Sequence, residues 1–439
     1  MLLFSARRAA KCPVMASSAE ILPVDASALI EQMCARARSA QRESVRLDSS
    51  AKSAALRSAA DAIRCDADAI LAANRKDLDT AKSAGLSAAM LDRLALDAGR
   101  LSAVAEAIEN VASLTDPVGE TIDCVRRPNG LEMSRIRIPI GLIGIIYESR
   151  PNVTADAAAL GFKSGNAVLL RGGSEAVHSN QAIHAAFARG LKGAGVNPDV
   201  VQFVPTQDRS AVGAMLAAHG LIDMIIPRGG KGLVARVQQD ARVPVLAHLD
   251  GICHTYIHRA ADTVKASEIA LNAKMRRTGI CGAMETLLID AKFPDTANLV
   301  ARLIDEGCEV RGDRRACAID SRIIAADNED WDTEYLAAVL SVRIVDGIDS
   351  ALDHIAEHSS SHTDAIVTED VAAAERFLAE VDSAIVMHNT SSQFADGGEF
   401  GLGAEIGIAT GRLHARGPVA LEGLTTYKWQ VRGSGQVRP

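Results

Sequence analysis

The stretch Leu142-Ile-Gly-Ile-Ile-Tyr147, with Ala167-Val-Leu-Leu170 after it, decides the fold of this chain. Both runs are short and predominantly apolar, and an alanine-rich segment of helical character separates them. A strand, a helix and a second strand in this order are the signature of a parallel sheet with helices on its faces. The stretch therefore predicts an α/β fold.

The same alternation continues toward the C-terminus, which predicts two such sheets. The further apolar runs are residues 200–204, 224–226, 286–289, 323–325, 365–367 and 384–387. Toward the N-terminus, residues 24–116 are predicted to be helical, because apolar residues recur at helical spacing. They include Leu56, Ala60, Ile63, Ala67 and Ile70, with Asn74 as the expected helix end.

Composition limits the class of protein. The chain has 439 residues, 48% of them hydrophobic but only 3% aromatic, which suits buried parallel strands under alanine-rich helices. The net charge of −8 argues against a nucleic-acid binder, and no apolar run is long enough for a membrane helix. The eight cysteines form no CxxC pair, so we expect free thiols, no metal site and a cytoplasmic location. Residues 1–20 fit a disordered tail or an over-extended start better than a targeting peptide.

One cysteine has a distinctive setting, in Asn272-Ala-Lys-Met-Arg-Arg-Thr-Gly-Ile-Cys281. Cations precede Cys281 and glycines flank it, which favours a thiolate that a substrate can approach. An apolar run follows at once, so Cys281 is expected on a loop that leads into a strand. A buried structural cysteine is the alternative, and local context alone leaves the two equally weighted.

Two glycine-rich turns follow predicted strands, Arg171-Gly-Gly-Ser174 and Pro227-Arg-Gly-Gly-Lys-Gly232. Such turns hold anions when free backbone N–H groups point outward, although a plain tight turn is the commoner case. A third strand ends in Arg150-Pro-Asn152. The Asn152 amide suits either an oxyanion or an ordinary helix cap.

These segments, in this order, resemble the gamma-glutamyl phosphate reductase (glutamate-5-semialdehyde dehydrogenase) family of the aldehyde dehydrogenase superfamily. The resemblance runs from about residue 28 to 435. It is also carried by Asp250-Gly-Ile-Cys-His254, by Asp396-Gly-Gly-Glu-Phe-Gly-Leu-Gly-Ala-Glu405, by His414-Ala-Arg-Gly-Pro418 and by Leu421-Glu-Gly-Leu-Thr-Thr-Tyr-Lys428.

The resemblance implies NADPH-dependent reduction of L-glutamyl 5-phosphate to L-glutamate 5-semialdehyde, with release of phosphate, as the second step of proline biosynthesis. It makes Cys281 the nucleophile that forms a thioester, with Asn152 at the oxyanion. It assigns the cofactor to Arg171, Gly172, Gly173, Ser174, Gly229, Gly230 and Glu334. Because the substrate is anionic at both ends, cations are expected around it, with Arg150, Lys274, Arg277 and Arg416 as candidates.

The sequence departs from its relatives near the nucleophile. Thr278 stands where the family often has proline and Gly282 where it often has asparagine. His248 stands where aldehyde-oxidising relatives carry a glutamate base, which fits a reductase whose thioester must meet hydride and not water. A half-buried, hydrogen-bonded histidine is the interpretation we favour for His248. The alternative functions are a hydrolytic aldehyde dehydrogenase and a non-catalytic scaffold.

The resemblance also implies a domain plan and partners. We expect a discontinuous Rossmann-type cofactor domain (21–122, 143–252 and 389–411), a catalytic domain (253–388) and a β oligomerisation arm (123–142 and 412–439). The arm implies a homodimer or homotetramer. Contact with the glutamate kinase of the preceding step is an open expectation, and neither a nucleic acid nor a membrane is expected as a partner.

Overall fold

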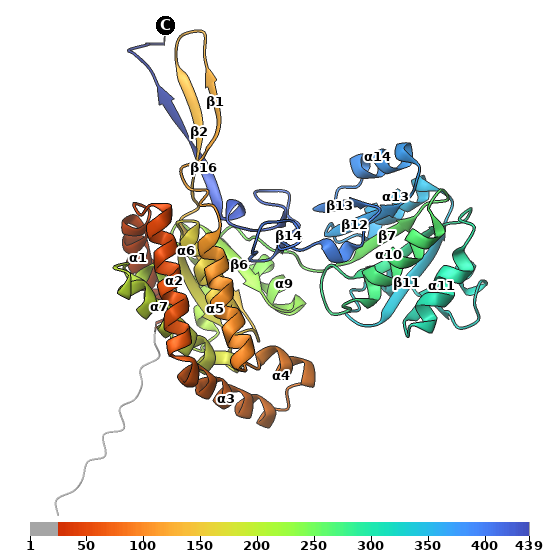
Figure 1. The fold of residues 1–439 in the computed structure, drawn as a ribbon, viewed down its shortest axis with the longest axis horizontal. Helices are drawn as coiled ribbons and strands as arrows, with labels where there is room; N and C mark the ends of the chain where they lie inside the picture. Colours follow the sequence, from red (N-terminus) through yellow and green to blue (C-terminus); the bar gives the residue numbers. More distant parts are fainter. Residues whose placement is uncertain (1–24, 439) are drawn as a thin grey trace, which may run out of the picture.

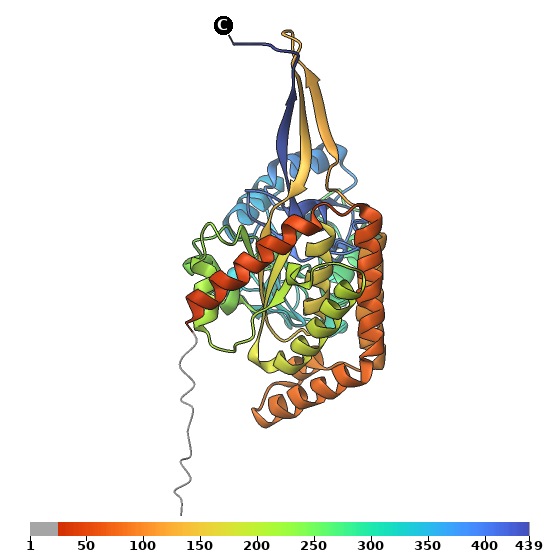
Figure 2. The ribbon, with the colours of Figure 1, turned by 90° about the vertical axis from the view of Figure 1, so that its left-hand side faces the viewer.

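The computed structural model describes residues 25–438, and Figure 1 shows two α/β lobes side by side with a thin three-stranded arm. Turned by 90°, the molecule shows the arm projecting away from both lobes (Figure 2). No helix among the described residues is long and apolar enough to cross a membrane. The prediction for residues 1–20 lies outside the described residues.

The first lobe is built on a four-stranded parallel sheet of order β5-β4-β3-β6. All six residues of β3 are buried, as its apolar sequence predicts. The strands are β3 (Leu142–Tyr147), β4 (Ala167–Gly172), β5 (Val201–Phe203) and β6 (Met224–Arg228). The helices are α1 (Ala26–Ser44), α2 (Ser49–Cys65), α3 (Ala67–Ser83), α4 (Ala88–Leu94), α5 (Ala98–Ser113), α6 (Asn152–Lys163), α7 (Val177–Gly193), α8 (Ser210–Ala217) and α9 (Lys231–Asp240).

The helical prediction for residues 24–116 is confirmed for the described residues by α1–α5, but the helix end predicted at Asn74 is wrong. Asn74 lies inside α3 and is fully buried. Its amide donates to Leu94 O at 2.9 Å and to Ser179 Oγ at 3.0 Å, and its Oδ1 accepts from Leu96 N at 2.8 Å. Tertiary partners therefore satisfy this side chain, while the actual helix break lies at Asp66, between α2 and α3.

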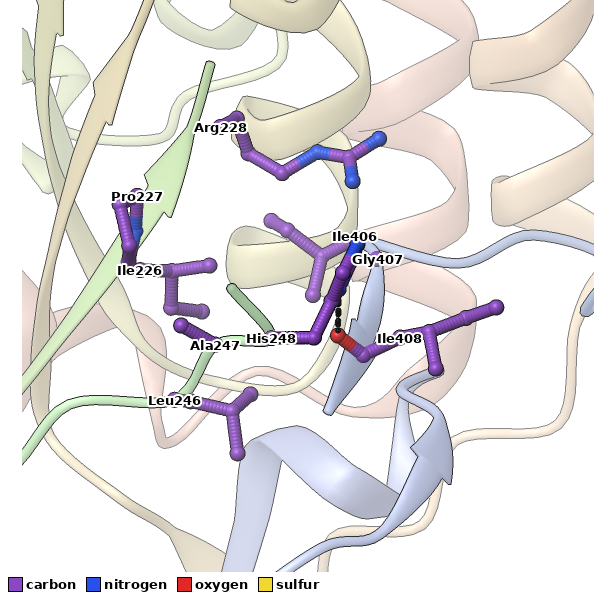
Figure 3. A pocket seen from close by; sticks show the side chains of 9 residues that line it. All are labelled: Ile226, Pro227, Arg228, Leu246, Ala247, His248, Ile406, Gly407 and Ile408. Atoms are coloured by element: carbon purple, nitrogen blue, oxygen red, sulfur yellow. Dashed lines mark hydrogen bonds between the residues drawn. The ribbon is translucent and has the colours of Figure 1, made fainter. Parts of the chain in front are cut away.

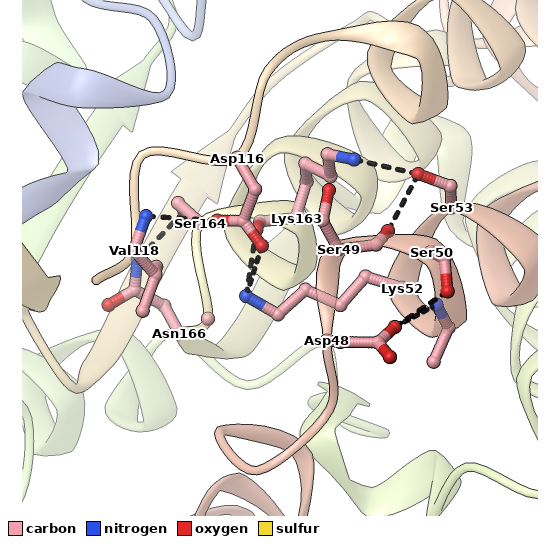
Figure 4. Close-up of polar contacts among 12 residues, drawn as sticks. Asp48, Ser49, Ser50, Lys52, Ser53, Asp116, Val118, Lys163, Ser164 and Asn166 are labelled. Atoms are coloured by element: carbon pink, nitrogen blue, oxygen red, sulfur yellow. Dashed lines mark hydrogen bonds and ion pairs between the residues drawn. The ribbon is translucent and has the colours of Figure 1, made fainter. Parts of the chain in front are cut away.

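A buried polar cluster joins α2, α6 and the segment after α5 (Figure 4). Lys52 Nζ pairs with Asp116 Oδ2 at 2.8 Å, with both side chains almost inaccessible to solvent. Lys163 Nζ donates to Ser53 Oγ at 2.8 Å and to Ala112 O at 3.1 Å. Burial lowers the pKa of Lys163. Buried ammonium groups persist only with such partners, so the cluster ties these helices together.

The second lobe contains a seven-stranded parallel sheet of order β10-β9-β11-β8-β7-β12-β13. Its strands are β7 (Cys253–Ile257), β8 (Met284–Asp290), β9 (Glu309–Gly312), β10 (Ile324–Ala325), β11 (Val339–Val345), β12 (Thr363–Val367) and β13 (Ile385–His388). The helices that accompany it are α10 (Thr263–Met275), α11 (Thr296–Asp305), α12 (Arg314–Cys317), α13 (Ile348–His358) and α14 (Val371–Glu380). Every apolar run quoted from the sequence lies on or beside a strand, whereas β7, β9 and β11 were not predicted.

The arm is an antiparallel sheet of β1 (Thr121–Arg126), β2 (Glu132–Pro139) and β16 (Thr425–Arg432). Strand β16 pairs along the whole of β2, so segments some 290 residues apart in sequence lie side by side. Two further short strands, β14 (Ile408–Ala409) and β15 (Gly417–Pro418), pair with each other near the junction of the lobes. The domain boundaries and the oligomerising role of the arm remain predictions.

Candidate active site

The carboxyl ends of β4, β3 and β6 form one edge of the first sheet, and the predicted cofactor residues lie there. Strand β4 ends in Arg171-Gly172, β3 leads into Glu148, and β6 ends in Arg228 before Gly229-Gly230. In open parallel sheets ligands bind beyond this edge, where helix N-termini and free backbone groups meet. The sheet order therefore brings the two glycine turns of the sequence together.

Arg171 is nearly buried, and its guanidinium is held by backbone oxygens. One terminal nitrogen donates to Gly172 O at 2.7 Å and the other to Gln207 O at 3.1 Å. Its Nε is buried and has no hydrogen-bond partner among the described residues. Ser174 begins the short 3-10 helix that follows. The guanidinium is thus held in place at the strand end by two backbone oxygens.

The turn before α9 already contacts an anionic group. Gly230 N donates to Glu148 Oε2 at 3.3 Å, next to the start of the helix at Lys231. A Cβ on Gly229 would lie 2.6 Å from the same carboxylate oxygen. The carboxylate lies where the free N–H groups of a helix N-terminus favour an anion. This turn therefore has the geometry of an anion site.

Cys281 lies on the loop before β8, as predicted, and is partly buried. The backbone around it is closely packed, because a Cβ on Gly251 would lie 2.2 Å from Cys281 O. Cys253 Sγ donates to the same oxygen at 3.1 Å. Burial raises the pKa of the Cys281 thiol to about 11, with Glu334 and Glu405 adding to the rise.

The cation that acts on the thiol differs from the ones the sequence suggested. Arg228, from the first lobe, lowers the pKa of Cys281. Lys274 lies in the preceding helix, fully buried and paired with Glu285 at 2.5 Å, so its charge is compensated. The cation that most clearly favours the Cys281 thiolate is therefore Arg228, and the contribution of the other cations that precede the cysteine in sequence stays a prediction. Burial is the largest influence on the thiol pKa, and the opposing charge comes from Arg228 at the end of β6.

Two histidines accompany Cys281. One side-chain atom from each of His248, Cys281 and His362 lies within 4.8 Å of the others, and the two rings meet edge to face at 5.1 Å. His248 is half-buried, as predicted, and lines a small pocket that Figure 3 shows beside Arg228 and Ile408. Its Nδ1 donates to Ile408 O at 2.7 Å, so in the neutral ring Nε2 carries the lone pair.

Glu334 accepts a hydrogen bond from Gly251 N at 3.0 Å and lies near enough to Cys281 to affect its pKa. Burial in turn raises the pKa of Glu334. Asn152 is the first residue of α6, and its Nδ2 donates to Asp156 Oδ2 at 2.9 Å. Burial raises the pKa of Asp156 to about 6. Because the Asp156 carboxylate accepts from one N–H of Asn152, the NH₂ end of the amide faces Asp156. The second N–H of that amide makes no hydrogen bond to the described residues.

The four candidate substrate cations fall into two groups. Arg416 donates to Asp382 Oδ1 at 2.6 Å and, like Lys274, has its charge compensated. Arg150 and Arg277 have no carboxylate partner within 4.0 Å in the described part of the chain. The pKa of Arg150 is lowered by desolvation and by the charges of nearby arginines, Arg277 among them, while Cys281 opposes the shift. Arg150 and Arg277 are therefore the two candidates with charge to spare near the cysteine.

Sequence reasoning missed three residues of this site, namely Arg228, His362 and Glu405. Arg228 was visible, because it stands inside the second glycine turn. Glu405 lies within the quoted C-terminal motif. His362 carried no local signal, since only the pairing of β12 with β7 brings the start of β12 to the cysteine loop.

Comparisons with known proteins agree with this architecture. The family model of the aldehyde dehydrogenases matches residues 8–316. The acetylating aldehyde dehydrogenase from Geobacillus thermoglucosidasius, 17% identical, shares the fold with a TM-score of 0.67 over 94% of this chain and 98% of its own. The chain thus has the aldehyde dehydrogenase fold.

Much closer relatives define the branch of the family. The gamma-glutamyl phosphate reductase of Novosphingobium aromaticivorans is 68% identical over 94% of this chain and 97% of its own length. The crystal structure of gamma-glutamyl phosphate reductase from Thermotoga maritima superposes with a TM-score of 0.92 at 41% identity, covering 93% of this chain and all of that one. The chain belongs to the aldehyde dehydrogenase family and, within it, to the gamma-glutamyl phosphate reductases, which makes it an oxidoreductase.

Proposed function

We propose that this chain reduces L-glutamyl 5-phosphate to L-glutamate 5-semialdehyde with NADPH, releasing phosphate, through a thioester on Cys281. The observation that carries the proposal is the setting of Cys281, which is partly buried on the second lobe and influenced by Arg228 at the edge of the first. High identity to gamma-glutamyl phosphate reductases along almost the whole chain supports the choice of substrate. The reaction belongs to proline biosynthesis.

In the first step the Cys281 thiolate attacks the acyl carbon and phosphate leaves. Phosphate is a good leaving group, so the protein needs little acid assistance. The thiolate forms against the cost of burial, and the Arg228 charge offsets part of that cost. The closely packed backbone at Gly251 keeps the sulfur in place.

The oxyanion of this step is bound by the Cys281 backbone N–H and the Asn152 amide. Asp156 accepts one Nδ2 hydrogen of Asn152, so the other remains for the substrate oxygen. A donor that is already oriented stabilises the developing charge without reorganisation, which is worth about 2.7–4 kcal/mol for one such group.

The residues at the sheet edge fit a phosphorylated dinucleotide. The guanidinium of Arg171 at the end of β4 suits a 2′-phosphate, and the turn of Gly229 and Gly230 suits a pyrophosphate where Glu148 accepts from the backbone. NADPH, when bound, supplies the hydride that reduces the thioester. Glu334, fixed by Gly251 N, is placed in our proposal at the nicotinamide ribose.

The substrate is held by Arg150 and Arg277, whose charges are uncompensated among the described residues. The two anionic ends of the substrate, a carboxylate and a phosphate, need cationic hydrogen-bond donors in the site. His248 replaces a carboxylate base beside the thioester. Burial lowers the pKa of His248, so its Nε2 is a weaker base toward an attacking water than an ordinary imidazole. The thioester therefore survives until reduction.

The decisive test is the reverse reaction, with 1-pyrroline-5-carboxylate as the source of the semialdehyde and NADP⁺ as oxidant. We expect NADP⁺ reduction that requires phosphate or arsenate and is faster than with NAD⁺. Fast reduction without either anion would contradict the proposal and indicate a hydrolytic dehydrogenase. Absence of any turnover in well-folded protein would instead favour a scaffold.

We further propose that the arm pairs with a second copy of the chain, as a dimer or a tetramer, and that the domain boundaries are those predicted from the sequence. Strand β16 exposes Tyr427, Trp429 and Val431 along its length. Isolated ribbons with exposed aromatic residues are stabilised by a partner surface. Contact with the kinase that makes the acyl phosphate would shorten the path of a reactive substrate.

A further inference from the structure

Three metal-ligating side chains gather beside the nucleophile from three separate segments. His248 follows α9, Cys281 precedes β8, and His362 immediately precedes β12. One donor atom of each lies within 4.8 Å of the other two. His362 is fully buried, whereas His248 and Cys281 are partly accessible. The cluster is thus partly accessible at His248 and Cys281 and fully buried at His362.

The unused nitrogen of each histidine is defined by what the other nitrogen contacts. His248 Nδ1 donates to Ile408 O, which leaves the Nε2 lone pair free. His362 Nδ1 lies 2.9 Å from Thr363 Oγ1 and 3.6 Å from Cys253 Sγ. His362 Nε2 is buried without a hydrogen-bond partner among residues 25–438. An unmet buried polar atom costs about 1–3 kcal/mol, so this nitrogen calls for a ligand that the protein itself does not supply.

The donor set suits one class of ligand. Two imidazole nitrogens and a thiolate are the ligands that Zn²⁺ prefers over harder cations. Tetrahedral zinc with bonds of about 2.0–2.3 Å brings its ligands to roughly 3.5 Å apart, compared with at most 4.8 Å between the donor atoms here. The Nδ1–H···O=C contact of His248 is the kind of outer hydrogen bond that orients zinc-bound histidines.

We propose that His248, Cys281 and His362 form a binding site for a thiophilic divalent cation of the Zn²⁺ type, and that occupation switches the enzyme off. A metal–sulfur bond withdraws the electron pair with which Cys281 attacks its substrate. One proton leaves the thiol on binding and no redox step is involved. The inhibition rests on the proposed nucleophilic role of Cys281, whereas the binding does not.

Binding is tested with the full chain and Co²⁺ as a spectroscopic probe. We expect one equivalent to give a thiolate-to-cobalt charge-transfer band and tetrahedral visible bands, both displaced by Zn²⁺. Cys281→Ser should abolish the charge-transfer band, and His362→Gln should weaken Zn²⁺ binding at least tenfold. His184→Gln is the matched control, because His184 is a half-buried histidine bonded to Val201 O outside the cluster. A band that survives in Cys281→Ser would overturn the proposal.

The consequence is tested separately. Zn²⁺ should slow iodoacetamide alkylation of Cys281 and inhibit turnover, and a chelator should restore both. His362→Gln should make turnover at least tenfold less sensitive to Zn²⁺, with His248→Gln as the second variant if His362→Gln does not fold. Inhibition that is equally strong in both histidine variants would overturn the site. Full turnover by Cys281→Ser would refute the proposed nucleophile and leave the metal-binding result standing.

Discussion

Gly251→Ala is the most informative single change, because it tests whether the position of Cys281 controls the reaction. A Cβ at residue 251 would lie 2.2 Å from Cys281 O and 2.7 Å from Cys281 Cα. Ordinary contacts begin at about 3.4 Å, so the cysteine loop must move by about 1 Å to admit the methyl group. The neighbouring atoms are backbone, which cannot rotate away as a side chain would.

A displacement of about 1 Å costs roughly 100-fold in a reaction that depends on near-attack geometry, or about 2.7 kcal/mol of transition-state stabilisation. We expect kcat to fall by about this factor, and iodoacetamide alkylation of Cys281, which needs no oriented substrate, to change much less. Overpacking should lower the free energy of unfolding by about 1–3 kcal/mol.

Steady-state kinetics in the reverse direction and urea unfolding measure the two effects. Gly213→Ala in α8 is the matched control, since nothing lies within 4 Å of the added methyl group. Activity of Gly251→Ala within threefold of the wild type would refute the reasoning, because it would mean that the loop tolerates the shift without consequence.

Four further outcomes are expected. Cys281→Ser should fold normally and lose nearly all turnover, since an alcohol is a far weaker nucleophile than a thiolate; substantial residual activity in the reductase assay would contradict the assignment. Arg171→Ala should raise the KM for NADPH at least tenfold and that for NADH much less, and equal losses would point to a purely structural arginine. Asp116→Asn should reduce the free energy of unfolding by about 3–5 kcal/mol, measured in urea, because it leaves the buried Lys52 without its carboxylate, while activity per folded molecule stays unchanged. His248→Glu should raise NADP⁺ reduction in the absence of phosphate, and no increase would show that a base at this position does not reach the thioester.

The elements that sequence predicted best are those whose side chains need no polar partner. Strands β3 and β4 are nearly uniform aliphatic runs, buried on both faces, and their position follows from that alone. Strand β7 was missed because it contains His254 and Thr255, which a sequence pattern assigns to the surface. His254 is in fact fully buried, with Nδ1 at 3.0 Å from Asp364 Oδ1 on the neighbouring strand β12. Such pairing is invisible until the strand order is known.

The candidate site, like the fold, was predicted only where the sequence signal is local. Cys281 and the glycine turns were found because their signal is local, in a few consecutive residues. The electrostatic setting of the thiol was not, because the charges that matter come from Arg228, Glu334 and Glu405, all remote in sequence. Lys274 is close to Cys281 in sequence and was therefore expected to act on the thiol. In the structure its charge is compensated by Glu285.

The charge that faces the Cys281 thiol is therefore set partly at the junction between the lobes, outside the cysteine loop. Arg228, at the end of β6, is the cation that lowers the thiol pKa, and its guanidinium packs against Gly407 in the segment that returns from the second lobe. A Cβ on Gly407 would lie 2.6 Å from the Arg228 Nη1 atom, and the φ of Gly407 is +147°, a conformation that L-residues rarely adopt. A side chain at residue 407 would therefore strain the backbone and displace the Arg228 guanidinium. A substitution that changes the packing of Arg228 against Gly407 therefore changes the charge near the Cys281 sulfur, even when it leaves the cysteine loop unchanged.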